Sequence, residues 1–168
     1  SEFENGKREP TLSQLSALLF KVFTIGIADV NENPTDIALS SVSVAENQPV
    51  GTVVGVLNTT DPDGDDTFTY SLVSGTGGAD NGAFILSGDQ LQTAASFDYE
   101  AQSSYSIRIR ATDQGGLYTE KVFTIAIADV NQNPTDIALS SVSVAENQPV
   151  GTVVGVLNTT DPDGDDTF

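Results

Sequence analysis

Two stretches of the chain indicate its fold class: SYSIRIRAT at residues 104–112 and YTEKVFTIAIA at residues 118–128. In both, apolar and polar side chains alternate, so the apolar ones fall on one face of an extended strand. The turn residues Gln114-Gly115-Gly116 lie between them. The pair is therefore predicted to form two antiparallel strands. The side chains expected to point inward are Tyr105, Ile107, Ile109, Ala111, Phe123, Ile125 and Ile127.

Shorter runs of the same alternating kind precede this pair. The predicted strands are Ile37–Val44 with a bend at Ser40-Ser41, Thr52–Leu57, Thr67–Leu72, Ala83–Leu86 and Gln90–Thr93. Ser87-Gly88-Asp89 separates the last two and is typical of a hairpin turn. About seven short strands within ~100 residues predict an all-β, seven-stranded Greek-key sandwich of the immunoglobulin-like kind.

An internal repeat sets the domain organisation. DVNQNP at residues 129–134 is nearly the same as DVNENP at residues 29–34, and residues 33–68 recur unchanged as residues 133–168. In the segment before these motifs, Gly26 is replaced by Ala126. Such a repeat predicts a tandem array of like domains. Residues 1–20 do not match the repeat and are left unassigned. We expect residues 35–134 to form a complete repeat. Residues 21–34 are expected to end a preceding repeat, and residues 135–168 to begin a following, truncated one.

Composition limits the kind of partner. The 168 residues carry 24 acidic and 6 basic side chains, a formal net charge of -18. This excess repels nucleic acid and anionic membrane surfaces and favours cations. The absence of Cys and His excludes thiolate and imidazole metal sites and the usual nucleophile–base pairs. The remaining oxygen ligands favour calcium or magnesium.

Acidic side chains gather where the predicted strands begin or end. They are Glu46, Asp61, Asp63, Asp65, Asp66, Asp98, Glu100, Asp113 and Asp129. At an intermediate dielectric, each close pair of like charges costs a few kcal/mol. A calcium ion, which takes about six to eight oxygen ligands, turns that repulsion into attraction. Each acidic turn taken singly is equally compatible with a solvated loop.

A series of short motifs resembles the cadherin repeat. In chain order they are AEN at residues 45–47, DPD at 61–63, YSL at 70–72, FDYE at 97–100, ATDQG at 111–115 and DVNQNP at 129–134. The chain looks most like the bacterial cadherin-like units of very large surface or secreted adhesins, and the resemblance covers residues 21–168. It implies repeats joined end to end with calcium ions in each junction. Together and in order, the motifs favour calcium over solvated turns.

The resemblance also implies the ligands of two junctions. The junction after the complete repeat would take Glu46, Asp98, Glu100, Asp129, Asn131 and Asn133, with Asp161 and Asp163 of the next repeat. The junction before it would take Asp29, Asn31 and Asn33 with Asp61, Asp63 and Asp113. The backbone carbonyl ligand that the resemblance implies from the Asp61–Phe68 loop is left open between Asp65 and Asp66. Because the family usually has Asp where this chain has Gln132, the later junction is predicted to bind fewer ions or bind them less tightly.

These observations predict a non-enzymatic, calcium-binding repeat of an extracellular adhesion protein, anchored through parts of the protein outside this sequence. Its expected partners are neighbouring repeats, with cell-surface or matrix ligands and homophilic contact as further candidates, and no nucleic acid. One alternative is a carbohydrate-binding accessory sandwich, which needs an exposed aromatic platform, whereas the chain has no Trp. Another is a glycosidase that uses Asp98 and Glu100, which needs paired acids across a cleft.

Overall fold

A computed structural model describes residues 11–12 and 24–164 of the chain. It divides into two compact units, Ser1–Val30 and Asn31–Phe168. Residues 1–10 and 13–23 lie outside the described residues. Residues 24–30 of the first unit have no regular secondary structure. Within the described ranges, no helix is long and apolar enough to cross a membrane.

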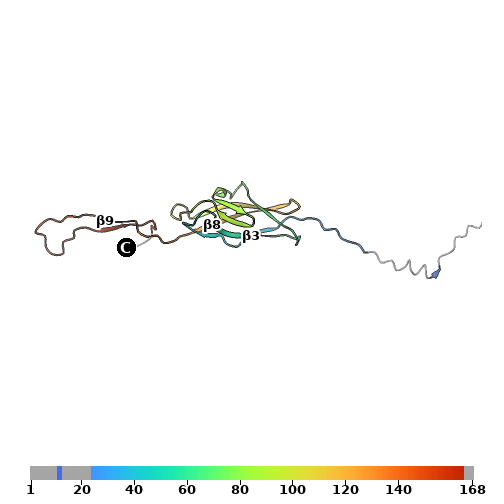
Figure 1. The fold of residues 1–168 in the computed structure, drawn as a ribbon, viewed down its shortest axis with the longest axis horizontal. Coiled ribbons are helices and arrows are strands. Elements are labelled where there is room, and N and C mark those ends of the chain that lie inside the picture. The colour runs from blue at the N-terminus through green and yellow to red at the C-terminus, as the bar shows by residue number, and fades with distance from the viewer. Residues whose placement is uncertain (1–10, 13–23, 165–168) are drawn as a thin grey trace, which may run out of the picture. The chain divides into compact units, whose positions relative to one another are not determined.

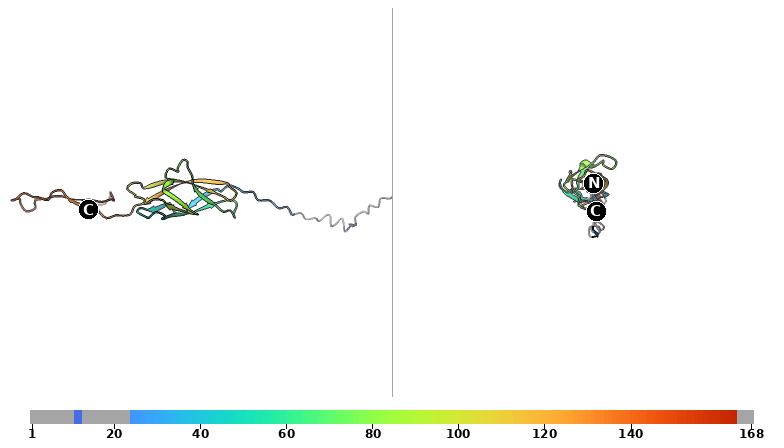
Figure 2. Two further views of the ribbon diagram at one scale, coloured as in Figure 1. Left: turned by 45° about the horizontal axis from the view of Figure 1, so that its top comes forward. Right: turned by 90° about the vertical axis from the view of Figure 1, so that its right-hand side faces the viewer.

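The second unit contains a sandwich of two four-stranded sheets (Figures 1 and 2). The first sheet has the order β1-β3-β6-β5 and the second the order β2-β8-β7-β4. The bounds are β1 Asp36–Leu39, β2 Ser43–Ala45, β3 Val53–Thr60, β4 Thr69–Leu72, β5 Phe84–Ser87, β6 Gln90–Thr93, β7 Ser104–Thr112 and β8 Tyr118–Ala128, with a 3-10 helix η1 at Asn81–Ala83. The all-β prediction is confirmed, and so are the predicted bounds of β7 and β8.

The first predicted strand is divided between the sheets at its bend. Residues before the bend form β1, which pairs antiparallel with β3, and residues after it form β2, which pairs parallel with β8. The chain crosses closely over Gly55 at this point, where an added Cβ would lie 2.8 Å from the carbonyl oxygen of Ser41. Only a residue without a side chain fits there. The strands on the two sides of the bend therefore belong to different sheets of the sandwich.

The core lies between the sheets and takes one face of each. Its buried apolar residues are Ile37, Val44, Val54, Leu57, Phe84, Leu91, Phe97, Ile107, Ile109, Ala111, Phe123, Ile125 and Ile127. The inward positions predicted for β8 are all buried, and those for β7 are buried except Tyr105, which is partly buried. Tyr105 instead completes an aromatic cluster with Phe84 and Phe97, the ring centroids of Phe97 and Tyr105 being 4.6 Å apart. Alternation of apolar side chains therefore produces the packing that holds the sheets together.

Side-chain hydrogen bonds hold the glycine-rich segment at residues 74–82 against the neighbouring strand β7. The side chain of Asn81 donates to the carbonyl oxygen of Val73 (2.8 Å) and accepts from the backbone N–H of Arg108 (3.0 Å). Asp80 accepts from the backbone N–H of Ser106 at 2.7 Å. These bonds fasten the segment along the part of β7 that β4 does not pair with. The segment thus covers an otherwise open strand edge.

Up to residue 164, where its description ends, the repeated segment after residue 134 forms a single two-stranded sheet, β9 at Asp136–Leu139 and β10 at Leu157–Thr160. Its sequence is identical to that of β1 and β3 with their flanking loops. Ile137 is 68% exposed, however, whereas its copy Ile37 is fully buried. This agrees with the expectation that two strands alone cannot enclose a core.

Strand register places the acidic loops at opposite ends of the sandwich. At one end, Asp36 pairs with Thr60 and Thr69 with Thr112, so the loops after β3 and β7 lie together. At the other end, Ala45 pairs with Ala128 and Ser104 with Ala126. The loops after β2 and β8 therefore meet the loop that precedes β7.

Candidate metal centres at the two ends of the sandwich

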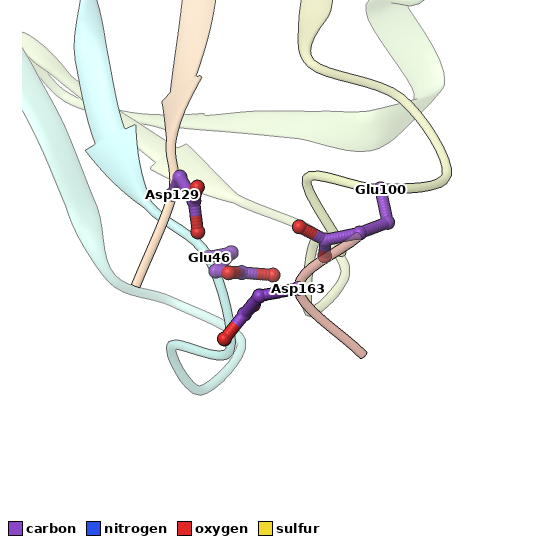
Figure 3. Close-up of side chains that lie close together, drawn as sticks. All are labelled: Glu46, Glu100, Asp129 and Asp163. Carbon is purple, nitrogen blue, oxygen red and sulfur yellow. The ribbon is translucent and has the colours of Figure 1, made fainter. Parts of the chain in front are cut away.

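Four carboxylates converge at the end where β2 and β8 finish (Figure 3). Glu46 directly follows β2, Asp129 directly follows β8, and Glu100 lies in the loop before β7. Asp163, from the loop after β10, is the fourth. Each of the four side chains has one carboxylate oxygen that lies within 4.8 Å of the corresponding oxygen of the other three. We call these four residues the downstream cluster.

Glu46 is the most enclosed member, with 1% of its surface exposed. Its Oε2 accepts from the backbone N–H of Tyr99 and its Oε1 from that of Val130, both at 3.0 Å. These two bonds, with a smaller contribution from the Gln132 side chain, hold the pKa of Glu46 below its ordinary value against the opposing effect of burial. Glu46 is therefore a fixed, ionised carboxylate at the base of the cluster.

Glu100 shows the opposite shift. A hydrogen bond from its own backbone N–H lowers its pKa, but burial and the negative charges of Glu46, Asp129 and Asp163 outweigh that bond and raise the pKa overall. Asp163 is 4% exposed, and its Oδ1 has no hydrogen-bond partner. A buried carboxylate oxygen without a donor is costly. Both observations indicate negative charge that the protein itself does not neutralise.

A second group of carboxylates lies in the loop between β3 and β4. Asp61, Asp63 and Asp66 form it, and we call it the upstream cluster. Oδ2 of Asp63 accepts from the backbone N–H of Glu32 at 2.7 Å. Oδ2 of both Asp61 and Asp66 is buried without a partner. Burial raises the pKa of Asp66, the Gln114 side chain opposes the rise, and the charges of Asp61, Asp63 and Asp113 add to it.

Asp113 connects the linker to this end of the sandwich. Its Oδ2 accepts from Nδ2 of Asn31 (3.0 Å) and its Oδ1 from the backbone N–H of Leu117 (2.9 Å). Burial raises the pKa of Asp113, but these bonds and those from Gly115 and Gly116 outweigh it and lower the pKa overall. A Cβ at Gly115 would overlap the Asn31 side chain. The glycine therefore permits the close approach of the linker.

Several predicted ligands lie outside the two clusters. Asp98 caps a turn, its Oδ1 accepting from the backbone N–H of Ala101 at 3.2 Å. Oδ1 of Asp161 accepts from the backbone N–H of Asp163 at 3.0 Å, and its Oδ2 is buried without a partner. Asn131 donates to the carbonyl oxygen of Gln132 at 2.8 Å. The remaining predicted ligands, all of them exposed, are Asp29, Asn33 and Asn133.

The two residues that the sequence left open for a carbonyl ligand differ in the position of their side chains. Asp66 belongs to the upstream cluster, whereas Asp65 is exposed and outside it. Gln114, which sequence reasoning treated only as a turn residue, donates from Nε2 to Oδ1 of Asp66 at 2.6 Å. No spacing rule signals that contact, because it joins two loops that are 48 positions apart.

The donor chemistry of both clusters fits a hard divalent cation. The side-chain donors gathered there are carboxylate oxygens, and the chain has neither Cys nor His. Buried carboxylate oxygens without hydrogen-bond partners occur in the loop after β3, at Asp61 and Asp66, and in the loop after β10, at Asp161 and Asp163. Oxygen-rich sites of this kind suit calcium, which accepts varied geometry, better than magnesium, which demands near-ideal octahedral geometry.

The described surface offers little support for a sugar-binding platform. Tyr99 and Tyr118 are the large aromatic side chains exposed among the described residues, at 37% and 48%. The guanidinium carbon of Arg110 lies 4.0 Å from the centroid of the Tyr118 ring and covers one of its faces. The Asp98–Glu100 pair likewise does not converge, since only Glu100 joins the downstream cluster.

The fold and the acidic ends of the sandwich define a class of β-sandwich repeat, and comparison with known proteins identifies it. A family model described as the cadherin domain matches residues 40–128. The chain belongs to the cadherin family. Cadherins are adhesion proteins without catalytic activity, so the expectation of a non-enzymatic, cadherin-like repeat is confirmed.

Individual relatives are protocadherins. Protocadherin Fat 2 of Rattus norvegicus is 36% identical over 167 residues, covering 94% of this chain and 4% of the relative. Protocadherin gamma-A11 of Homo sapiens is 33% identical over 147 residues, covering 82% and 15%. The protocadherin gammaB7 EC3-6 cis-dimer structure has a TM-score of 0.60 at 29% identity, covering 78% of this chain and 32% of that one. The chain thus spans a small part of the curated relatives, and the likeness to bacterial units stays a prediction.

Proposed function

We propose that the two clusters bind calcium ions and thereby stiffen the joints between successive repeats of an extracellular adhesion protein. The observation that carries the proposal is the downstream cluster itself, because its carboxylates come from both sides of a joint. Glu46, Glu100 and Asp129 belong to the sandwich, and Asp163 belongs to the segment that follows. Without a cation their charges repel each other across the joint. With calcium, the same charges hold the two parts together.

The residues that would hold the ions in the downstream cluster are Glu46, Glu100, Asp129 and Asp163. Those in the upstream cluster are Asp61, Asp63 and Asp66, with Asp113 and Asn31 beside them. Asp98, Asp161, Asn131, Asn133, Asp29 and Asn33 stay candidate ligands, through a turn of their side chains or through their backbone carbonyls. Calcium supplies charge neutralisation and a rigid connection; the carboxylates supply the geometry.

The organisation of the chain supports a linear array as the setting for these joints. We propose residues 35–134 as one complete repeat and residues 21–34 and 135–168 as parts of its neighbours. A stiff array holds a binding region away from its anchor, which suits contact with a cell surface, a matrix or a second copy of the protein. Its location would be outside the cell, with anchoring through other parts of the protein.

Calcium titration by calorimetry tests the proposal. Heat of binding is expected with the wild-type chain, and Asp163→Asn is expected to weaken it by at least about tenfold, because ligand charge sets calcium affinity. Asp89→Asn is the matched control, since Asp89 is an exposed acid in the β5–β6 turn outside both clusters. Equal affinities for the two variants, or no binding heat at all, would contradict calcium binding at the joint.

A further inference from the structure

The two linker motifs differ at a single position, which is Glu32 in one and Gln132 in the other. Their backbones make the same contact with the repeat that follows. The N–H of Glu32 donates to Oδ2 of Asp63, and the N–H of Gln132 donates to Oδ2 of Asp163. The Gln132 side chain, which follows a complete sandwich, is partly buried.

Gln132 uses its side chain to reach into the downstream cluster. Its Nε2 donates to Oε1 of Glu46 at 3.1 Å. That oxygen already accepts from the backbone N–H of Val130, and the other oxygen of Glu46 accepts from Tyr99. A carboxylate has about four acceptor positions. Three of those of Glu46 are thus taken by the protein's own donors.

We infer that Gln132 competes with calcium for Glu46 and makes the downstream joint the one that needs more calcium to stiffen. The inference rests on the proposed function of the clusters. The amide must release Oε1 of Glu46 before that oxygen can face an ion. The amide also brings no negative charge, whereas Glu at this position would add a carboxylate to the cluster. The buried, unpartnered Oδ1 of Asp163 still points to a cation in this joint.

An array that contains both kinds of linker then responds to calcium in two steps. Joints with an acidic residue at this position stiffen first as calcium rises, and joints with glutamine follow. Between the two thresholds the array is a chain of stiff segments connected by flexible ones. Position 132 would thus determine where such an array bends.

Two variants separate competition by the amide from the absence of charge. Gln132→Ala removes the donor without adding charge, and Gln132→Glu replaces the donor with a carboxylate. The control is Glu32→Gln, which alters the other linker. Nuclear magnetic resonance follows the backbone amides of Tyr99 and Val130, which donate to Glu46 in the downstream cluster, during calcium titration of the whole chain. The Gln132 carboxamide is followed in the same spectra, first in EDTA.

In EDTA, the Gln132 carboxamide is expected to exchange with solvent more slowly than that of a free glutamine. Gln132→Ala frees an oxygen of Glu46, so we expect this variant to bind calcium a few-fold more tightly than wild type. Gln132→Glu also adds a negative charge, so we expect it to bind calcium about tenfold more tightly than wild type. Glu32→Gln should stay within about twofold of wild type at these reporters. Fast carboxamide exchange in EDTA, or an alanine variant no tighter than wild type, overturns the inference while the proposed function stands. Reporters that respond to calcium in none of the variants overturn both.

Discussion

Asn31 and Asp113 are 82 positions apart in the sequence, yet Nδ2 of Asn31 donates to Oδ2 of Asp113 at 3.0 Å. The bond fastens the linker to the loop after β7, beside the upstream cluster. It depends on Gly115, because a Cβ there would overlap the Asn31 side chain. The linker is therefore attached to the sandwich by a side-chain hydrogen bond that needs no ion.

Gly115→Ala should break this docking. The added methyl group displaces Asn31, and the lost hydrogen bond should lower the free energy of unfolding by about 1 kcal/mol, as measured by urea denaturation. Gly82→Ala is the control, since a Cβ at Gly82 meets open space. Equal stability of the two variants would show that the Asn31–Asp113 bond does not hold the linker.

Asp66→Asn should have opposite effects with and without calcium. Burial and the neighbouring acids raise the pKa of the Asp66 carboxyl group, which means that its negative charge is unfavourable in the folded protein. In EDTA the substitution removes that charge, so the variant should melt at a higher temperature than wild type. In calcium it removes a ligand, and affinity should fall by at least about tenfold. Asp65→Asn, at the adjacent exposed position, should show neither change. Similar behaviour of the two variants would argue against a role for Asp66.

Asn81→Ala should loosen the segment that covers the edge of β7. The substitution leaves the carbonyl oxygen of Val73 and the N–H of Arg108 without their side-chain partners. An unpaired buried polar group costs about 1–3 kcal/mol, so the free energy of unfolding should fall within that range. Hydrogen exchange at the Arg108 amide should accelerate. A variant with wild-type protection at Arg108 would mean that the edge is covered without Asn81.

The ion pairs on the outer face of β7 and β8 predict a pH dependence. Glu120 bonds to Arg110 (2.6 Å) and Arg108 (2.5 Å), and these two partners hold its pKa below the ordinary 4.5. A carboxylate with a lowered pKa contributes stability above its unfolded-state pKa, and that contribution is lost as pH falls through the folded-state pKa. Wild type should therefore be more stable than Glu120→Gln in EDTA at pH 7, and the difference should vanish well below pH 4.5. A difference that does not change with pH would contradict this role.

The sequence predicted the long strands best, and the reason is physical. Ile107, Ile109 and Ile125 alternate with polar residues over many positions, so one register satisfies the whole pattern. Division of the first strand between the sheets was not predicted, because it depends on the close approach of Ser41 to Gly55. A bend in a sequence pattern does not reveal which sheet each half joins.

The candidate site was predictable in position but not in detail. The acidic residues follow or precede the predicted strands, and the motifs place Glu46 and Asp129 at the same end of the sandwich. Turn geometry decides which of two neighbouring acids joins a cluster: Glu100 and Asp66 do, whereas Asp98 and Asp65 do not. The contact of Gln132 with Glu46 joins residues 86 positions apart and has no local signal. The sequence pattern therefore predicts where the acidic residues lie, but it does not predict the direction of their side chains.

The most direct test of the account measures the stiffness of the downstream joint. Because the chain has no cysteine, spin labels can be attached at Asn58→Cys and Asn158→Cys alone, both at exposed positions. Pulsed electron resonance then gives the distribution of distances between the sandwich and the segment beyond the joint. We predict a narrow distribution in saturating calcium and a broad one in EDTA. Distributions of equal width in the two conditions would contradict calcium stiffening of this joint.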